Sequence, residues 1–416
     1  MKDKLIKIIV ETARVIVGVV FVFSGFVKSI DPLGTAYKIG DYLHAFHLEF
    51  FNPLALPASI GLSGVEMLIG LLLLIGVYRR FSTIIALLFI LVMDGVTLYL
   101  AIANPISDCG CFGDALVLTN WQTFWKNVFF TACIVFLFIY YKRITFMAAK
   151  RDAAFILFFC VAYPVMLSIY CYTWALPLID FRPYKIGNTI EAGSRVKTEG
   201  PEFETTLIYE KDGVQKEFTL ENYPANDPSW TFVTTISTEI GGSAQAEGEL
   251  FFLSNEQGYD VTEEVLDSPG YTFLLVAGKL QRAKETKADL INDIYDYALE
   301  HQYGFYGVTA SSDLDIEEWR INTGAEYPFL KADETLLKTV IRSNPGLVLI
   351  KQGKVIYKWA ALQVPEEKFF DRPLDEINFD QLAKRMSCYR LIIAFAVLIF
   401  PLGAAAIRRS KYEKKK

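Results

Sequence analysis

The chain has 416 residues, of which 52% are hydrophobic and 21% are charged, and its net charge is −6 at pH 7. A mean hydropathy of +0.29 is too high for a wholly soluble protein of this length, which excludes an ordinary cytosolic enzyme. The modest acidic charge and the absence of a basic domain predict no nucleic-acid partner.

Long apolar runs recur along the chain. A bilayer core about 30 Å thick requires about 20 helical residues at roughly 1.5 Å each, and such windows predict six spans in contact with the lipid bilayer. The first window carries Glu11 and Arg14 and lacks a small-residue cleavage site, so we interpret it as a retained span rather than a signal peptide. The predicted spans cover residues 6–27, 55–78, 82–103, 122–141, 153–176 and 390–407.

Lysine and arginine residues mark one side of these spans. Cytoplasmic loops are enriched in such residues, and with six spans every basic segment falls on one side. The sequence therefore predicts a bacterial inner-membrane protein with both termini cytoplasmic, and with loops 28–54 and 104–121 and the domain 177–388 in the periplasm. The basic residues are Lys2, Lys4 and Lys7, then Arg79 and Arg80, then Lys142, Arg143, Lys150 and Arg151, then Arg408, Arg409, Lys411 and the terminal lysines.

The first four predicted spans have short connections, which favours a four-helix bundle with antiparallel neighbours. Between the first two, Asp31 and Pro32 precede apolar residues at helical spacing from Tyr37 to Phe51. This pattern predicts a short helix that lies in the outer membrane interface.

The large segment after the fifth span has a soluble composition. It predicts a hairpin, a β–α–β unit, a further helix and a closing hairpin. The expected elements are strands 203–209 and 216–220 around Lys211-Asp212-Gly213, strand 271–276, helix 286–300, strand 305–309, helix 316–322, and strands 347–350 and 354–359.

The order of elements over residues 260–365 resembles a thioredoxin-like fold. Pro345 stands where that fold carries its cis-proline, so we expect a cis bond there. Thioredoxins carry Cys-x-x-Cys after the first central strand, whereas this chain has Gly-Lys-Leu-Gln-Arg at 278–282 and no cysteine between Cys171 and Cys388. We therefore expect this domain to bind a protein partner without exchanging electrons itself.

The predicted fold class is an α-helical membrane protein, a four-helix bundle plus two further spans, with an α/β thioredoxin-like periplasmic domain that lacks Cys-x-x-Cys. The expected divisions are the bundle at 1–145, the fifth span at 146–180, a β-rich segment at 181–260, the thioredoxin-like domain at 261–386, and the last span with its basic tail at 387–416.

The sharpest local motif is Asp-Cys-Gly-Cys-Phe-Gly-Asp at 108–114, in the loop after the third span. In an oxidising compartment such cysteines are normally disulfide-bonded, and the small, strained Cys-x-Cys ring favours exchange. Gly110 supplies the backbone freedom for closure, while the flanking carboxylates would disfavour a thiolate. We expect Cys109 and Cys111 to form an exchangeable disulfide; a static disulfide or two inert thiols is the alternative.

Further motifs accompany these cysteines. They are Phe-Ser-Gly-Phe-Val-Lys at 23–28 with Asp31-Pro32, then Glu66 with Leu68, Gly70 and Leu71, then Cys-Gly-Cys-Phe-Gly at 109–113. Together they resemble the membrane families DoxX and MauE over about residues 1–145, which implies a four-span protein linked to redox work outside the cytoplasm. The bundle is also similar to that of vitamin-K-epoxide-reductase enzymes, but their Cys-x-x-Cys is absent, so a quinone cofactor is an expectation by analogy alone.

Charged and metal-binding side chains in or near the spans are further candidates. A charge inside a span indicates function by default, and we expect Glu66 to handle protons, whereas Asp94 is interpreted as structural. Glu11 and Arg14, three residues apart, are expected to pair.

Two histidines and the remaining cysteines allow other roles. His44 and His47 share a predicted side with Cys109 and Cys111, and such a set could hold a tetrahedral metal. The spacing matches no known finger, so no metal is predicted. Cys133 and Cys160 are interpreted as packing residues, and Cys171 and Cys388 as bystanders rather than electron relays.

Three hypotheses of function follow. The first is a membrane thiol–disulfide oxidoreductase, or an accessory to one, that uses Cys109, Cys111 and Glu66 while the outer domain binds a periplasmic or membrane protein. The second is a non-enzymatic, membrane-anchored binding or assembly factor for exported proteins. The third is a subunit of a quinone-linked oxidoreductase. Whether the two cysteines cycle separates the first from the second.

Overall fold

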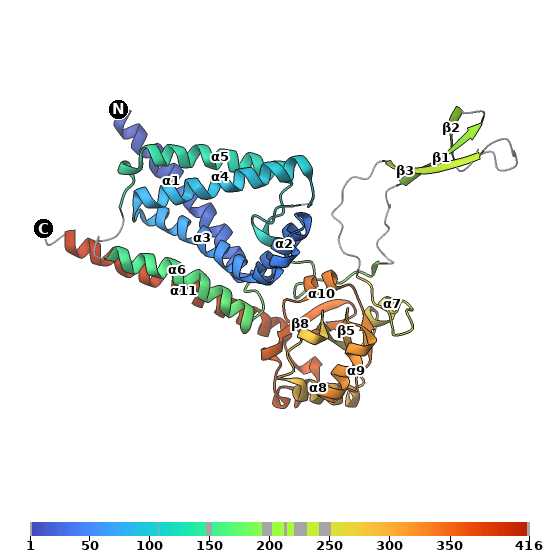
Figure 1. Ribbon diagram of the computed structural model, residues 1–416. Coiled ribbons are helices and arrows are strands. Elements are labelled where there is room, and N and C mark those ends of the chain that lie inside the picture. Colours follow the sequence, from blue (N-terminus) through green and yellow to red (C-terminus); the bar gives the residue numbers. More distant parts are fainter. Residues whose placement is uncertain are drawn as a thin grey trace.

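A computed structural model describes residues 2–106, 108–146, 152–193, 202–211, 214–219, 231–240 and 251–413. Long helices form one part of the molecule and an α/β domain forms another (Figure 1). The helices are α1 (Lys2–Ile30), α2 (Pro32–Ala45), α3 (Ala55–Ile75), α4 (Arg79–Ala103), α5 (Asn120–Ile139), α6 (Ala153–Thr173) and α11 (Phe379–Glu413), with short 3-10 helices η1 (Glu49–Leu54), η2 (Gly113–Ala115) and η3 (Tyr141–Arg143).

Among the residues that the structure describes, four helical segments are long and apolar enough to cross a membrane: Glu49–Ile75, Arg79–Ala103, Asn120–Ile139 and Ala153–Thr173. They confirm the second to fifth predicted spans as helices able to span a bilayer. The first and sixth predicted spans lie within α1 and α11. That these two helices also cross the membrane stays a prediction.

Helices α1 and α3 pack at very short range. A Cβ atom at Gly25 would lie 2.6 Å from the backbone N of Met67, and one at Gly70 would lie 2.6 Å from the backbone N of Val22. Only glycine allows two helix backbones to approach this closely. The contact brings the adjacent positions Ser24 and Glu66 together.

Charged residues within the helices make polar contacts. Glu11 and Arg14 form the predicted ion pair at 2.6 Å, and Arg14 also donates to the carbonyl of Leu74 at the end of α3. Asp94 on α4 accepts a 2.6 Å hydrogen bond from Thr131 on α5, which fits its structural interpretation. These contacts fix neighbouring helices against each other.

The predicted interfacial helix is present as α2 and begins at Pro32, earlier than the periodicity indicated. The Asp31 side chain caps it by accepting from the backbone N–H of Gly34 at 3.0 Å. Figure 1 shows α2 at the end of the bundle that faces the α/β domain. Its location in a membrane interface stays a prediction.

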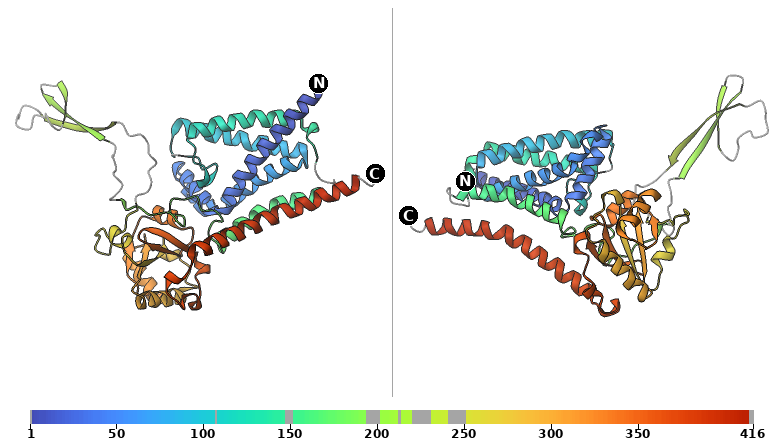
Figure 2. Two further views of the ribbon diagram at one scale, coloured as in Figure 1. Left: turned by 180° about the vertical axis from the view of Figure 1, so that it is seen from behind. Right: turned by 60° about the horizontal axis from the view of Figure 1, so that its bottom comes forward.

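Helices α6 and α11 run side by side along the bundle (Figure 2). The Tyr163 hydroxyl donates to the carbonyl of Ala394 at 2.9 Å, and Phe26 of α1 stacks on Phe395. Helix α11 is continuous from Phe379, so the last predicted span is the later part of a longer helix. Cys160 is fully buried among these helices, as its packing role requires.

The α/β domain contains a five-stranded sheet in the order β6-β5-β4-β7-β8. Strands β4 and β5 are parallel, whereas β7 is antiparallel to both β4 and β8. This is the predicted β–α–β unit followed by a closing hairpin, a thioredoxin-like arrangement, and the Asn344–Pro345 bond is cis as expected. The elements are α7 (Thr262–Leu266), β4 (Tyr271–Ala277), α8 (Ala288–Glu300), β5 (Gly304–Thr309), α9 (Asp313–Thr323), β6 (Phe329–Lys331), α10 (Glu334–Val340), β7 (Gly346–Lys351) and β8 (Lys354–Ala360).

Each face of this sheet is covered by a hydrophobic core. One core contains Trp319 and Tyr327, whose side chains hydrogen-bond at 3.0 Å. The other contains Ile190 and Phe251, which come from segments before the first strand of the sheet. The sequence did not predict β6 and α10, because elements of three and seven residues are too short to show a periodic pattern.

The predicted hairpin is present as β1 (Glu202–Lys211) paired antiparallel with β2 (Val214–Thr219). A third strand, β3 (Thr231–Ile240), which the sequence did not predict, pairs with the other edge of β1. The turn residues Asp212 and Gly213 lie outside the described residues, as do Lys150 and Arg151 of the predicted basic loop.

Candidate functional site

The cysteine pair lies in the loop between α4 and α5. Gly110 between the two cysteines has a φ of +63°, a left-handed conformation that glycine adopts without strain, and its N–H donates to Asp108 Oδ2 at 3.0 Å. Both thiols are free and lie within hydrogen-bonding reach of each other. The predicted disulfide is therefore not formed in this structure, which contains the reduced pair.

The two thiols differ in their affinity for a proton. A hydrogen bond from the Cys111 thiol lowers the pKa of Cys109, against the opposing effect of burial, and Lys126 adds a favourable charge. The same hydrogen bond and burial raise the pKa of Cys111. A thiolate therefore forms more readily at Cys109 than at Cys111.

Each of the two carboxylates that flank the motif pairs with a cation. Asp108 pairs with Lys38 of α2 at 2.6 Å, and Asp114 pairs with Arg342 of the α/β domain at 3.0 Å. A cation thus accompanies each carboxylate, and the pKa of Cys109 is lowered although both carboxylates flank the motif.

Glu66 lies next to the cysteine loop, on α3. Its Oε1 is 2.6 Å from Nζ of Lys28, and these side chains are 5% and 2% exposed. The Ser24 hydroxyl lies 2.7 Å from both Glu66 Oε2 and the carbonyl oxygen of Cys111. Because a hydroxyl has one proton, Ser24 donates to only one of these two acceptors at a time. Its position between them links the buried ion pair to the Cys111 backbone.

The structure thus brings all three predicted site residues together. Sequence reasoning named Ser24 and Lys28 only as parts of a motif, and it did not consider Lys126. The signal for Lys126 was present, because a lysine inside a predicted span is a functional candidate by default. Its Nζ lies 4.3 Å from the centre of the Phe112 ring.

A cavity opens beside Cys111 between α1, α4 and α5. Its walls are mostly aromatic and aliphatic, with polar groups from a few side chains, the mixture that is typical of small-molecule sites. It is lined by Val20, Phe21, Ser24, Glu66, Phe89, Ile90, Met93, Cys111, Phe112, Lys126, Asn127 and Phe130.

The alternative roles of other residues find no geometric support. His44 contacts Glu49 at 2.9 Å, and within the described parts of the chain no three His, Cys, Asp or Glu side chains converge as a metal site. Cys171 is buried and Cys388 is exposed, and both are free thiols. In the α/β domain, the loop with the cis-proline contacts the loop at 278–282, since the Asn344 side chain donates to the carbonyl of Lys279 at 2.8 Å.

Comparisons with known proteins support the predicted resemblance in part. Residues 6–140 match the family model described as methylamine utilisation protein MauE, and residues 203–240 match a domain of unknown function (DUF8463). No curated protein matches the chain. A solution structure of a candidate protein disulfide isomerase from Bacteroides thetaiotaomicron is similar at 17% identity, with a TM-score of 0.24 over 33% of this chain and 82% of that chain.

The lowered pKa of Cys109 predicts that its alkylation reaches half the maximal rate at a low pH. We expect the rate with iodoacetamide to reach half its maximum below about pH 8.5, the ordinary cysteine value, and to fall as the pH drops through the lowered pKa. Cys111→Ala removes the hydrogen-bond donor and should move the midpoint upward. Peptide-level mass spectrometry of the full-length protein measures the rates. Equal midpoints in parent and variant would show that Cys111 does not stabilise the thiolate.

Proposed function

We propose that this protein is a membrane thiol–disulfide oxidoreductase, or an accessory to one, that acts through Cys109 and Cys111. The observation that carries the proposal is the asymmetric thiol pair: a nucleophile with a lowered pKa is hydrogen-bonded to a second thiol that keeps its proton. Two inert packing cysteines would not need this asymmetry. The MauE match over the bundle supports a membrane accessory role.

The proposed exchange proceeds in two displacements. The Cys109 thiolate attacks a disulfide of the partner, forms a mixed disulfide and releases one partner thiolate, which takes a proton. Cys111 then loses its proton and attacks Sγ of Cys109, which releases the second partner thiolate. The partner disulfide gains two electrons and two protons, and the pair becomes the Cys109–Cys111 disulfide. The reverse sequence oxidises a partner dithiol.

We propose that Glu66 helps to hold the cysteine loop in place and does not itself exchange a proton with either sulfur. Its oxygens contact Lys28 and Ser24, and Ser24 contacts the backbone of Cys111. The carboxylate therefore acts on Cys111 through an intervening hydroxyl. The α/β domain, which has no cysteine, is proposed to bind the polypeptide partner.

Cys111→Ala should trap a partner on Cys109, because the mixed disulfide then lacks its resolving thiol. Cys109→Ala lacks the nucleophile and should trap none, and the double variant is the matched control. Non-reducing gels of native membranes, followed by identification of a reducible adduct, make the measurement. If Cys111→Ala forms no adduct and the double variant keeps full activity, the binding or assembly-factor hypothesis replaces the exchange hypothesis.

We further propose a bacterial inner-membrane location with six spans, both termini cytoplasmic and the α/β domain periplasmic. Helices α1 and α11, of 29 and 35 residues, are long enough to add two spans to the four apolar ones. With six spans the basic segments fall on one side.

Reporter fusions test this topology. A reporter that is active only in the periplasm should be active when inserted in the α/β domain and inactive at either terminus. A cytoplasmic reporter should give the opposite pattern. Cytoplasmic activity at the α/β domain would refute the proposed orientation.

The cavity beside Cys111 favours a second candidate, a quinone-linked oxidoreductase. Its aromatic and aliphatic walls would suit a planar ring, and Lys126 could donate to a ring oxygen. A quinone would supply a lipid-soluble acceptor for the two electrons and two protons of the reduced cysteine pair.

A cavity-filling substitution tests this candidate. We expect a short-chain quinone to oxidise the reduced pair to a disulfide, and Met93→Trp, which fills the cavity from α4, to slow this at least about fivefold. The control is Val92→Trp, since Val92 is exposed on the same helix. The disulfide fraction is followed by thiol trapping over time. Equal rates in both variants would reject the cavity as a quinone site.

A further inference from the structure

Helix α2 flanks the reactive cysteine directly. The Tyr42 hydroxyl donates to the carbonyl oxygen of Cys109 at 2.9 Å, and Lys38 pairs with Asp108 at 2.6 Å. A Cβ atom at Gly110 would lie 3.2 Å from Cγ of Lys38, so helix and loop are in close contact. Cys109 is only 9% exposed beside this helix. Helix α2 thus packs against the backbone of the loop that carries this nearly buried cysteine.

Helix α2 is weakly anchored over the loop. Its buried residues all lie between 32 and 36, and none between 37 and 45 is buried. Beyond its end, Phe46 packs on Tyr99 of α4. Within the protein itself, the second half of α2 thus has few buried apolar contacts, and elements of this kind open at low free energy.

One residue of the α/β domain bridges α2 and the cysteine loop. The Arg342 guanidinium contacts both carboxylate oxygens of Asp31, the cap of α2, at 3.0 and 3.2 Å, and Oδ2 of Asp114 at 3.0 Å. The side chain is 8% exposed, and a Cβ atom at Gly34 would lie 2.9 Å from its Nη2. Planar charge-assisted contacts of this kind are strong and directional.

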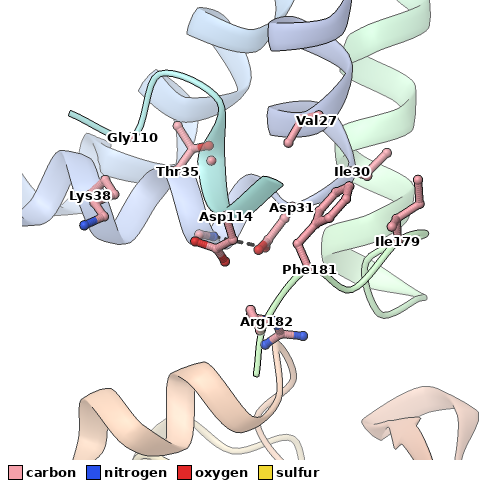
Figure 3. A pocket seen from close by; sticks show the side chains of 12 residues that line it. Val27, Ile30, Asp31, Thr35, Lys38, Gly110, Asp114, Ile179, Phe181 and Arg182 are labelled. Atoms are coloured by element: carbon pink, nitrogen blue, oxygen red, sulfur yellow. Dashed lines mark hydrogen bonds between the residues drawn. The ribbon is translucent and has the colours of Figure 1, made fainter. Parts of the chain in front are cut away.

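The surroundings of Arg342 strengthen the bridge. Lys338 of α10 lies over the ring of Tyr37 on α2 at 4.9 Å, and Arg342 lies over the same ring at 5.2 Å. Figure 3 shows Asp31 and Asp114 close together at a pocket that also involves Gly110 of the cysteine loop and Arg182 of the linker to the α/β domain. The α/β domain thus contacts both α2 and the segment that follows the two cysteines.

We propose that α2 is a movable cover over Cys109 and that the α/β domain holds it closed through Arg342. The inference rests on the proposed thiol exchange and adds its regulation. Binding of a polypeptide to the α/β domain would pull Arg342 from Asp31 and Asp114, release α2 and expose the Cys109 thiolate. This gives a thioredoxin-like domain without cysteines a role: it couples partner binding to thiol exposure.

The test is the alkylation rate of Cys109 in the reduced full-length protein, resolved by peptide mass spectrometry. Arg342→Ala removes the bridge and should raise the rate about tenfold or more, as expected for the loss of charge-assisted hydrogen bonds. Tyr42→Phe removes one hydroxyl contact from the cover itself and should raise it about threefold. Arg320→Ala is the control, because Arg320 also forms two ion pairs but lies on α9 and pairs with Glu256 and Glu317.

The possible results distinguish the proposed role of α2 as a cover from the proposed thiol exchange. Faster labelling in Arg342→Ala and Tyr42→Phe, with Arg320→Ala at the parental rate, supports the cover even if no mixed disulfide is ever trapped. Parental rates in both test variants overturn the cover while leaving exchange intact. If Arg342→Ala is protease-sensitive, and thus misfolded, Tyr42→Phe decides: an unchanged rate overturns the proposal.

Discussion

The buried ion pair between Lys28 and Glu66 constrains the rest of the bundle. Two charges inside a set of apolar helices are tolerated only when they neutralise each other, and removal of one partner from such a pair costs about 3–5 kcal/mol. The pair requires α1 and α3 to meet at one register and at short range. Glycines at 25 and 70 allow that approach. Ser24 then lies where it can hold the backbone of Cys111.

The reactive loop is consequently fixed from two directions. From inside the bundle, the ion pair and Ser24 hold Cys111; from the other side, Arg342 holds Asp114 and the cap of α2. Between these anchors, Gly110 lets the chain turn so that the two thiols can hydrogen-bond. The asymmetry between the thiols therefore depends on tertiary contacts around a three-residue motif.

The α/β domain combines a thioredoxin-like order of strands with a loop that has no cysteine. Its sheet order and cis-proline position follow the thioredoxin-like pattern, while the loop at 278–282 carries no cysteine. The residues next to the cis bond serve instead as a contact between domains, since Arg342 precedes it by three positions. Arg342 and Lys338, near the end of α10, are thus directed at the bundle.

The sequence by itself determined the long helices, the strands β1, β2, β4, β5, β7 and β8, and the choice of Cys109, Cys111 and Glu66 as candidate site residues, because hydropathy, periodicity and short motifs are local properties. Only the tertiary structure decided which thiol loses its proton more readily and which cations accompany Asp108 and Asp114. Those answers depend on Lys38, Lys126 and Arg342, which lie far from the cysteines in the chain or carry no motif. Electrostatic and hydrogen-bond effects act through space, so no pattern along the chain encodes them.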